Sequence, residues 1–182
     1  LHDALPISFY ERGHHVINVD MEKDMMRITE KERPDDINLC VGVGNKEGEA
    51  SFFRQGDWGG LSTFVESNCK KEAMETESKI HITTLKKICN DYVKDKVISF
   101  LKIDVEGMEK DVLLGMDFDM YRPKILVIES TLPCTDIPNF SEWEHIVLSK
   151  NYHFVYTHGV NRYYVADECQ ELDERFEPWE VM

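Results

Sequence analysis

The feature that most constrains the fold is the apolar run Val97–Ile103, which reads VISFLKI and ends at Asp104. A run of this kind is typical of a strand buried on both faces of a parallel sheet. The segment Met108–Leu114 then has helical spacing, and a second apolar run, Lys124–Ile128, ends at Glu129. A strand, a helical connection and another strand in this order predict an α/β fold containing parallel strands.

The upstream part of the chain continues the alternation. We expect a short strand over His15–Val19, ending at Asp20, and a helix over Glu22–Arg33, because Pro34 cannot continue it. The next strands are expected over Ile37–Val43 and Glu49–Arg54. Between these two strands, Asn-Lys-Glu-Gly is favourable turn chemistry.

The middle of the chain is less regular. Gln55–Ser62 contains three glycines and is expected to be a loop, and Glu66–Ser78 is expected to be a polar excursion. Ile80–Thr83 favours a strand and Leu85–Tyr92 favours a helix. The organisation is that of one domain without internal repeats.

The last third predicts a helix followed by two paired strands. Ser141–Lys150 has an apolar stripe, and Ser141 with Glu144 has the spacing of a capping box. His153–Thr157 and Arg162–Val165 predict an antiparallel pair that closes the sheet.

Composition limits the classes of partner. A formal net charge of −14 argues against nucleic acid and against an anionic membrane surface. No apolar run approaches the roughly 18 residues of a membrane span, and no signal peptide is visible. The five cysteines form no CxxC pair and have no histidine at ligand spacing, so we expect reduced thiols, a cytoplasmic protein and no metal ligands.

Three segments are expected along the chain. Residues 1–8 resemble translated sequencing-adapter sequence and are interpreted as a non-native leader. Residues 9–167 form the domain, and residues 168–182 form an acidic C-terminal tail.

Ligands of α/β sheets bind beyond the carboxyl ends of the strands, which directs attention to the polar residues there. Asp104 and Glu106 are the strongest candidates, because two carboxylates followed by Gly107 can orient a cationic cofactor or accept a proton from a hydroxyl. A helix cap is the alternative reading for either one. Asp20 can bind the hydroxyls of a ribose, or it can cap the following helix.

Gly44 and Asn45 follow the next expected strand. A glycine lets the backbone approach a flat group, and the Asn45 amide can pair with an adenine edge. A plain turn explains the same residues, and the residues themselves slightly favour that reading.

Several linked motifs resemble those of the FkbM family of methyltransferases. In chain order they are Val16–Asp20, Asn38–Gly48, Gly60–Thr63, Phe100–Glu109 (FLKIDVEGME), Val112–Gly115 (VLLG), Arg122–Lys124 (RPK) and Val127–Glu129. The resemblance covers roughly residues 9 to 165.

The resemblance implies a class I methyltransferase fold of the Rossmann-like type, with a mostly parallel sheet, helices on both faces and a C-terminal antiparallel hairpin. It implies S-adenosylmethionine as cofactor and a hydroxyl acceptor, often on a sugar or a natural-product precursor. Asp20-Met21 stands where the family usually has Glu followed by Pro, so both residues are expected at the cofactor. The family's first strand and glycine-rich turn are expected upstream of Phe9 and outside this sequence.

If the protein acts on a methyl acceptor, further residues are candidates for contacting it. Asp104 or Glu106 is expected to act as the base or to orient the cofactor, and Glu129 and His158 are expected to contact the acceptor. The loop residues Trp58, Ser62 and Thr63 are expected to close over a sugar, although packing in the core explains Trp58 as well.

Two other readings stay open. A nicotinamide-dependent oxidoreductase also places an acid after the second strand of its sheet. A non-catalytic binding domain can retain the same fold without the chemistry.

Overall fold

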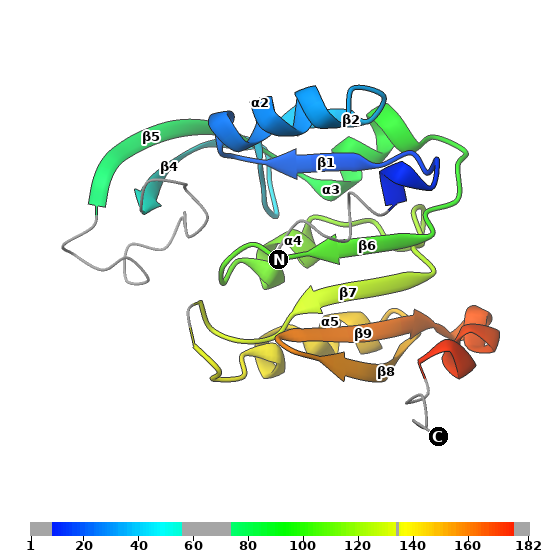
Figure 1. The fold of residues 1–182 in the computed structure, drawn as a ribbon. Coiled ribbons are helices and arrows are strands. Elements are labelled where there is room, and N and C mark those ends of the chain that lie inside the picture. The colour runs from blue at the N-terminus through cyan, green and yellow to red at the C-terminus, as the bar shows by residue number, and fades with distance from the viewer. Residues whose placement is uncertain (1–8, 56–73, 134, 177–182) are drawn as a thin grey trace, which may run out of the picture. The chain divides into compact units, whose positions relative to one another are not determined.

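The computed structural model describes residues 9–55, 74–133 and 135–176 of the 182-residue chain. The elements in chain order are β1 (Ile17–Asp20), α2 (Lys23–Glu32), β2 (Ile37–Cys40), β3 (Gly42–Val43), β4 (Gly48–Gln55), β5 (Met74–Thr83), α3 (Leu85–Ile88), the π-helical η2 (Cys89–Val93), β6 (Phe100–Ile103), α4 (Glu109–Leu114), β7 (Ile125–Glu129), the 3₁₀ turn η3 (Phe140–Glu142), α5 (Glu144–Leu148), β8 (Tyr152–His158), β9 (Asn161–Ala166) and the 3₁₀ segment η4 (Asp167–Arg175) (Figure 1).

The chain divides into two compact units. The first contains Leu1–Gly42 and Gly48–Ile82, and the second contains Val43–Glu47 and Thr83–Met182.

In the first unit, β1 and β2 pair in parallel, with Ile17 opposite Ile37, and α2 packs against both strands. This confirms the strand that ends at Asp20 and the helix that stops before Pro34. The buried Arg33 follows α2 and donates from Nη1 to Asn18 Oδ1 at 2.9 Å, which ties the end of the helix to β1.

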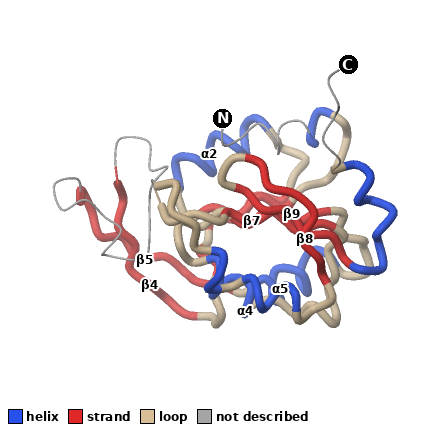
Figure 2. The backbone as a smooth tube through the Cα atoms, turned by 90° about the horizontal axis from the view of Figure 1, so that it is seen from below, coloured by secondary structure: helices blue, strands red, loops and turns tan. Residues whose placement is uncertain are grey.

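The strand expected over Ile37–Val43 is two strands. The first part, β2, pairs with β1, whereas Gly42 and Val43 form β3 in a separate sheet of order β3-β5-β4. The alternating strand after Gly48 is confirmed as β4, which pairs antiparallel with β5 along most of its length (Figure 2). The polar excursion expected over Glu66–Ser78 is therefore wrong for Met74 onward, because cross-strand pairing can hold polar residues in a strand.

The second unit is built on a four-stranded sheet of order β6-β7-β9-β8 (Figure 1). β6 and β7 are parallel, and β9 runs antiparallel to both β7 and β8, which confirms the predicted closing hairpin. The strand expected from Val97 begins only at Phe100, and Val97 is 72% exposed. Apolar character alone does not place a residue in the core.

The core of this unit lies between the sheet and its helices. Its fully buried members are Leu113, Leu126, Ile128, Trp143, Val147, Tyr164 and Val165. α4 and α5 lie next to each other in Figure 2, and α5 also packs against β8. Burial of Trp143 and Val147 confirms the predicted apolar stripe.

The capping box predicted at Ser141 and Glu144 is wrong. Ser141 lies inside the 3₁₀ turn η3, and no side chain caps α5. The Glu144 carboxylate instead accepts hydrogen bonds from Arg162 Nη2 at 2.7 Å and from the Tyr164 hydroxyl at 2.8 Å. Two donors from β9, one of them cationic, outcompete a backbone amide for this carboxylate.

The helix expected over Leu85–Tyr92 begins as predicted and then widens. Thr84 caps α3 by accepting from Lys87 N, and the chain continues as the π-helical η2. The acidic segment after Ala166 forms η4, in which Cys169 is buried.

The fold is thus an α/β domain with mixed sheets and several helices. Of the mostly parallel sheet that was expected, the described residues contain the parallel pairs β1–β2 and β6–β7. The four-stranded sheet itself is mixed, because β9 is antiparallel to both of its neighbours. Among the helices of the described residues, none combines the length and the apolar character that crossing a bilayer requires.

Candidate active site: three carboxylates beyond β6 and β7

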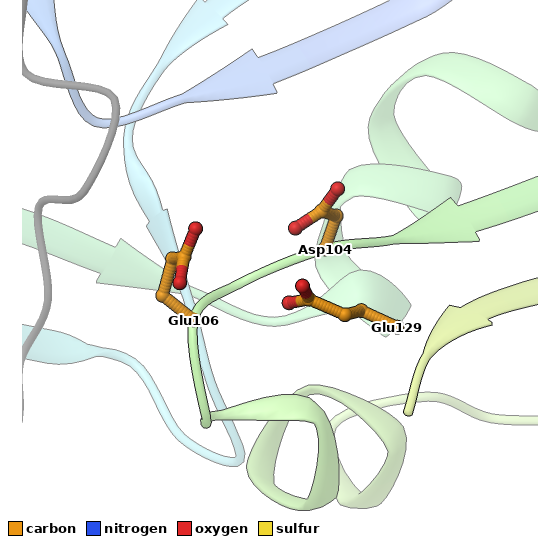
Figure 3. A group of neighbouring side chains, drawn as sticks. All are labelled: Asp104, Glu106 and Glu129. Atoms are coloured by element: carbon orange, nitrogen blue, oxygen red, sulfur yellow. The ribbon is translucent and has the colours of Figure 1, made fainter. Parts of the chain in front are cut away.

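Three carboxylates converge at the carboxyl ends of the parallel strands β6 and β7 (Figure 3). Asp104 follows β6 directly, Glu106 lies in the next turn, and Glu129 is the last residue of β7. Because β6 and β7 are parallel neighbours in register, both strands deliver their last residues to the same end of the sheet. Oxygen atoms of the three side chains lie within 4.8 Å of one another. The structure therefore brings together Asp104 and Glu106, expected to be catalytic, with Glu129, expected to contact the acceptor.

The turn after Asp104 has an unusual backbone. Glu106 has φ 51° and Gly107 has φ 99°, so two successive residues adopt positive φ. Glycine tolerates this conformation, whereas a residue with a Cβ pays about 1–2 kcal/mol for it. Strain of this kind persists only where neighbouring interactions enforce it.

Glu109, the first residue of α4, enforces the turn. Its side chain is 1% exposed, and its Oε1 accepts a hydrogen bond from Gly107 N at 3.0 Å. Its Oε2 accepts from Asn139 Nδ2 at 3.3 Å. Burial raises the pKa of Glu109, and the hydrogen bonds from backbone N–H groups and from Asn139 oppose that rise.

Sequence reasoning missed Glu109 as a site residue. The available signal was a third carboxylate in DVEGME, directly after a glycine that must turn the chain. In the structure Glu109 is buried, whereas Glu106 lies beside Asp104 and Glu129. The spacing in the sequence does not reveal this difference.

Glu129 has the most perturbed carboxyl of the cluster. Burial, the negative charges of Asp104 and Glu106, and a hydrogen bond with Asp104 raise the pKa of Glu129 to about 8. At neutral pH a carboxyl with this pKa is mostly in its protonated form. On its other side, Asp104 Oδ2 accepts from Lys102 Nζ at 2.9 Å. The cluster thus combines a paired carboxylate, a protonated carboxyl and a further acid.

The predicted cofactor residues Gly44 and Asn45 also belong to the second unit. Gly44 is buried, and its N–H donates to Thr83 O at 2.9 Å. The exposed Asn45 donates from Nδ2 to Asp111 Oδ1 at 2.5 Å, which ties the turn after β3 to α4. The structural reading of these residues as a turn is therefore supported, and their contact with an adenine stays a prediction.

Asp20 and Met21, the other predicted cofactor residues, belong to the first unit. Asp20 is exposed at the end of β1, and its Oδ1 accepts from Glu22 N at 2.8 Å. This bond lies before α2, whose N-cap residue is Glu22 and which has no side-chain capping hydrogen bond, so the capping alternative for Asp20 is wrong. Met21 is half-buried. Their roles at a ribose stay predictions.

His158 lies at the same end of the sheet as Glu129. Asn161 on β9 is opposite both Glu129 on β7 and His158 on β8, so His158 is two strands away. Its side chain is exposed, and its ring stacks on Tyr156 with centroids 6.5 Å apart. Trp58, Ser62 and Thr63 lie outside the described residues, so their expected contact with a sugar stays a prediction.

Two surface hollows lie elsewhere in the second unit. One is lined by Phe118, Asp119, Arg122, Asn151, Asp167 and Glu168, and the other by Lys94–Ile98 and Met120–Arg122. In the first, Arg122 already pairs with Glu168 and donates to the carbonyls of Lys150 and Asn151. Because its cation is used internally, this hollow is a weaker candidate than the carboxylates.

An α/β domain with polar groups beyond parallel strands has the architecture of enzymes that bind small ligands at the carboxyl ends of the sheet. The family model described as the methyltransferase FkbM domain matches residues 3–154, so the chain belongs to this family of methyltransferases. The resemblance indicated by the sequence motifs is thereby confirmed. Neither the comparison with curated proteins nor the comparison with solved structures gave a match.

Proposed function

We propose that the protein is a methyltransferase that uses S-adenosylmethionine to methylate a hydroxyl group of a small acceptor, with a saccharide as the preferred class. The observation that carries the proposal is the carboxylate cluster of Asp104, Glu106 and Glu129 beyond two parallel strands. Family membership supports methyl transfer as the reaction class. It also argues against the nicotinamide-dependent oxidoreductase.

The cluster suits a hydroxyl acceptor because an alcohol needs both a hydrogen-bond acceptor for its proton and a fixed position. Asp104 is the proposed proton acceptor, since Lys102 and the Glu129 carboxyl hold it from two sides. The Glu129 carboxyl keeps its proton, donates a hydrogen bond to Asp104 and thereby fixes the Asp104 side chain. Glu106, which the turn aims at the same point, is proposed to orient the acceptor (Figure 3).

The residues present fit a cationic cofactor. S-adenosylmethionine supplies a methyl group on a positively charged sulfur, and carboxylates are suitable neighbours for a cation. Asp104 is proposed to face it, and Gly44 with Asn45 is proposed to lie beside its base. Asp20 with Met21 is proposed to lie at its ribose. The hydrogen bond from Glu22 does not exclude this role of Asp20, because a carboxylate has about four acceptor positions.

A saccharide is proposed because its adjacent hydroxyls can donate to several carboxylates at once, and the oxygens within 4.8 Å offer that arrangement. Trp58, Ser62, Thr63 and His158 are the proposed further contacts. A reducing compartment such as the cytoplasm is also proposed, and the free thiols of Cys40, Cys89 and Cys169 are consistent with it.

The test is transfer of radiolabelled methyl from S-adenosylmethionine to a panel of mono- and oligosaccharides, with the product identified by mass spectrometry. We expect an O-methylated sugar from the wild-type chain and a rate lower by at least about 10²-fold for Asp104→Asn. Asp119→Asn is the matched control, because it makes the same change at an exposed carboxylate paired with Lys150. Full activity of Asp104→Asn would refute the proposed proton acceptor. Failure of every acceptor while the cofactor still binds would favour the non-catalytic binding domain.

A further inference from the structure

We propose that Asp104, Glu106 and Glu129 form a binding site for one hard divalent cation, of the class of Mg²⁺, Mn²⁺ and Ca²⁺. No metal ligands were expected from the sequence, so this site is new. It also goes beyond the proposed function, because binding of the ion is measured without cofactor, acceptor or methyl transfer.

The spacing of the carboxylate oxygens fits coordination of one ion. Two oxygens that bind one ion are separated by at most twice the metal–oxygen distance. This largest separation is about 4.2 Å for Mg²⁺ and about 4.8 Å for Ca²⁺. The three carboxylates each place an oxygen within 4.8 Å of the others. One ion can therefore reach all three after small rotations of the side chains, which lie next to one another in Figure 3.

Glu129 also has a buried carboxylate oxygen without a hydrogen-bond partner among the described residues. Glu129 is 6% exposed, and the oxygen concerned is Oε2. An unsatisfied buried oxygen of this kind costs about 1–3 kcal/mol. A cation between the three side chains would satisfy this oxygen, and its binding would release the proton that Glu129 holds in the metal-free chain.

A neighbouring amide shows the same deficit. Asn161 is the cross-strand partner of Glu129, and its Oδ1 is also buried without a partner in the described part of the chain. Side chains of directly opposed residues lie on one face of a sheet, with Cβ atoms about 4.5–5.5 Å apart. The amide oxygen of Asn161 is therefore a fourth oxygen donor close to Glu129, either on the ion or on a water bound to it.

The donor set determines the kind of ion. All donors are carboxylate or amide oxygens, which suit Mg²⁺, Mn²⁺ and Ca²⁺, whereas zinc sites usually contain nitrogen or sulfur ligands. Three acidic groups so close together also repel one another when ionised, and a divalent cation removes that repulsion. Charge and donor chemistry thus point to the same class of ion.

Glu109 supports the site from behind. By accepting the hydrogen bond from Gly107 N, it holds the turn that places Glu106 opposite Glu129. Groups that orient metal ligands in this way typically affect metal affinity by about 10–100-fold. Glu109 is therefore a positioning residue for this site and not itself a ligand.

The test is titration of the metal-free chain with MnCl₂, followed by the electron paramagnetic resonance signal of free Mn²⁺, and with MgCl₂ by calorimetry. We expect one Mn²⁺ per chain in the wild type, displaced by Mg²⁺. Glu129→Gln, which keeps the shape of the side chain, and Glu106→Gln should each weaken binding by at least about tenfold. Asp119→Asn, the matched change at an exposed carboxylate, should bind as the wild type does.

Two outcomes would overturn the site. One is no saturable binding of Mn²⁺ by a wild-type chain whose thermal unfolding is cooperative. The other is equal affinity in the wild type, Glu129→Gln and Glu106→Gln, with cooperative unfolding of each variant in EDTA as the check that it is folded. Either result leaves the proposed methyl transfer untouched, and loss of methyl transfer with binding intact would reject the function but keep the site.

Discussion

At Glu129, burial and the charges of two neighbouring carboxylates act in the same direction on the pKa. Together they raise the pKa of Glu129 to about 8, although nothing in the sequence distinguishes this glutamate from an ordinary acid at the end of a strand. Asp104 lies beside Lys102, with Nζ 2.9 Å from Oδ2. The two carboxyls at the ends of adjacent strands thus have different surroundings.

Glu106 offers a direct test of function against stability. Glu106→Gly removes both the carboxylate and the penalty for φ 51°, whereas Glu106→Gln removes only the charge. We expect both variants to lose methyl transfer, and Glu106→Gly to have the higher free energy of unfolding by about 1 kcal/mol. Urea denaturation and the methyl-transfer assay measure the two effects. Equal stability of the two variants would show that the turn is not strained.

Gly115, after α4, is required by close packing. A Cβ added at Gly115 would lie 2.1 Å from the carbonyl oxygen of Gly44. The φ of Gly115, −79°, is ordinary for any residue, so backbone conformation does not require a glycine here. Gly115→Ala should therefore destabilise the protein by about 1–3 kcal/mol through steric overlap alone. Gly48→Ala is the control, because nothing lies within 4 Å of the added atom and its φ is also unexceptional. Thermal unfolding of both variants tests the difference, and equal melting temperatures would contradict it.

At the scale of elements, η4 is held against β8 by one histidine. His153 on β8 lies 2.8 Å from Asp167 through Nδ1 and 2.9 Å from Asp173 through Nε2. Partial burial alone would lower the pKa of His153, but hydrogen bonds and charge attraction from the two carboxylates outweigh it and raise the pKa. An acidic segment can dock here because both ring nitrogens of His153 face a carboxylate.

This arrangement predicts a pH dependence of stability. Because the pKa of His153 is higher in the folded than in the unfolded state, its contribution is complete below about pH 6.5. The contribution is lost as the pH rises through the raised folded value. The melting temperature of His153→Gln should therefore lie below that of the wild type by more at about pH 6 than at about pH 9. These two pH values are chosen to lie on either side of the titration of His153. A difference that is independent of pH would show that His153 acts only through packing.

Sequence reasoning predicted elements best where one local signal dominated. The β8–β9 hairpin and α2 followed their patterns, and Pro34 marked the end of the helix. It failed where a distant partner decided the outcome. The Glu144 carboxylate binds Arg162 and Tyr164 instead of forming the predicted cap. Residues 74–78 form a strand because they pair with β4. Such partners are far away in sequence and leave no local mark.

At the scale of the whole molecule, charge is the dominant property. A net charge of −14 on 182 residues opposes compaction through self-repulsion. We expect the melting temperature to rise when NaCl is added, since the screening length falls from about 30 Å at 0.01 M to about 10 Å at 0.1 M. Scanning calorimetry in EDTA excludes an effect of divalent ions. An unchanged or lower melting temperature in salt would indicate that local ion pairs, such as Arg122 with Glu168, outweigh the net repulsion.

The sequence by itself determined the α/β class, the family and the identities of Asp104, Glu106 and Glu129, because these follow from apolar runs and the polar residues that end them. Tertiary structure alone decided that the three acids lie together, that Glu109 turns inward to hold the turn at Glu106, and that the pKa of Glu129 is raised. Each of these depends on distances between strands and on the exclusion of water. Both quantities arise only when β6 and β7 pair and the core closes over them.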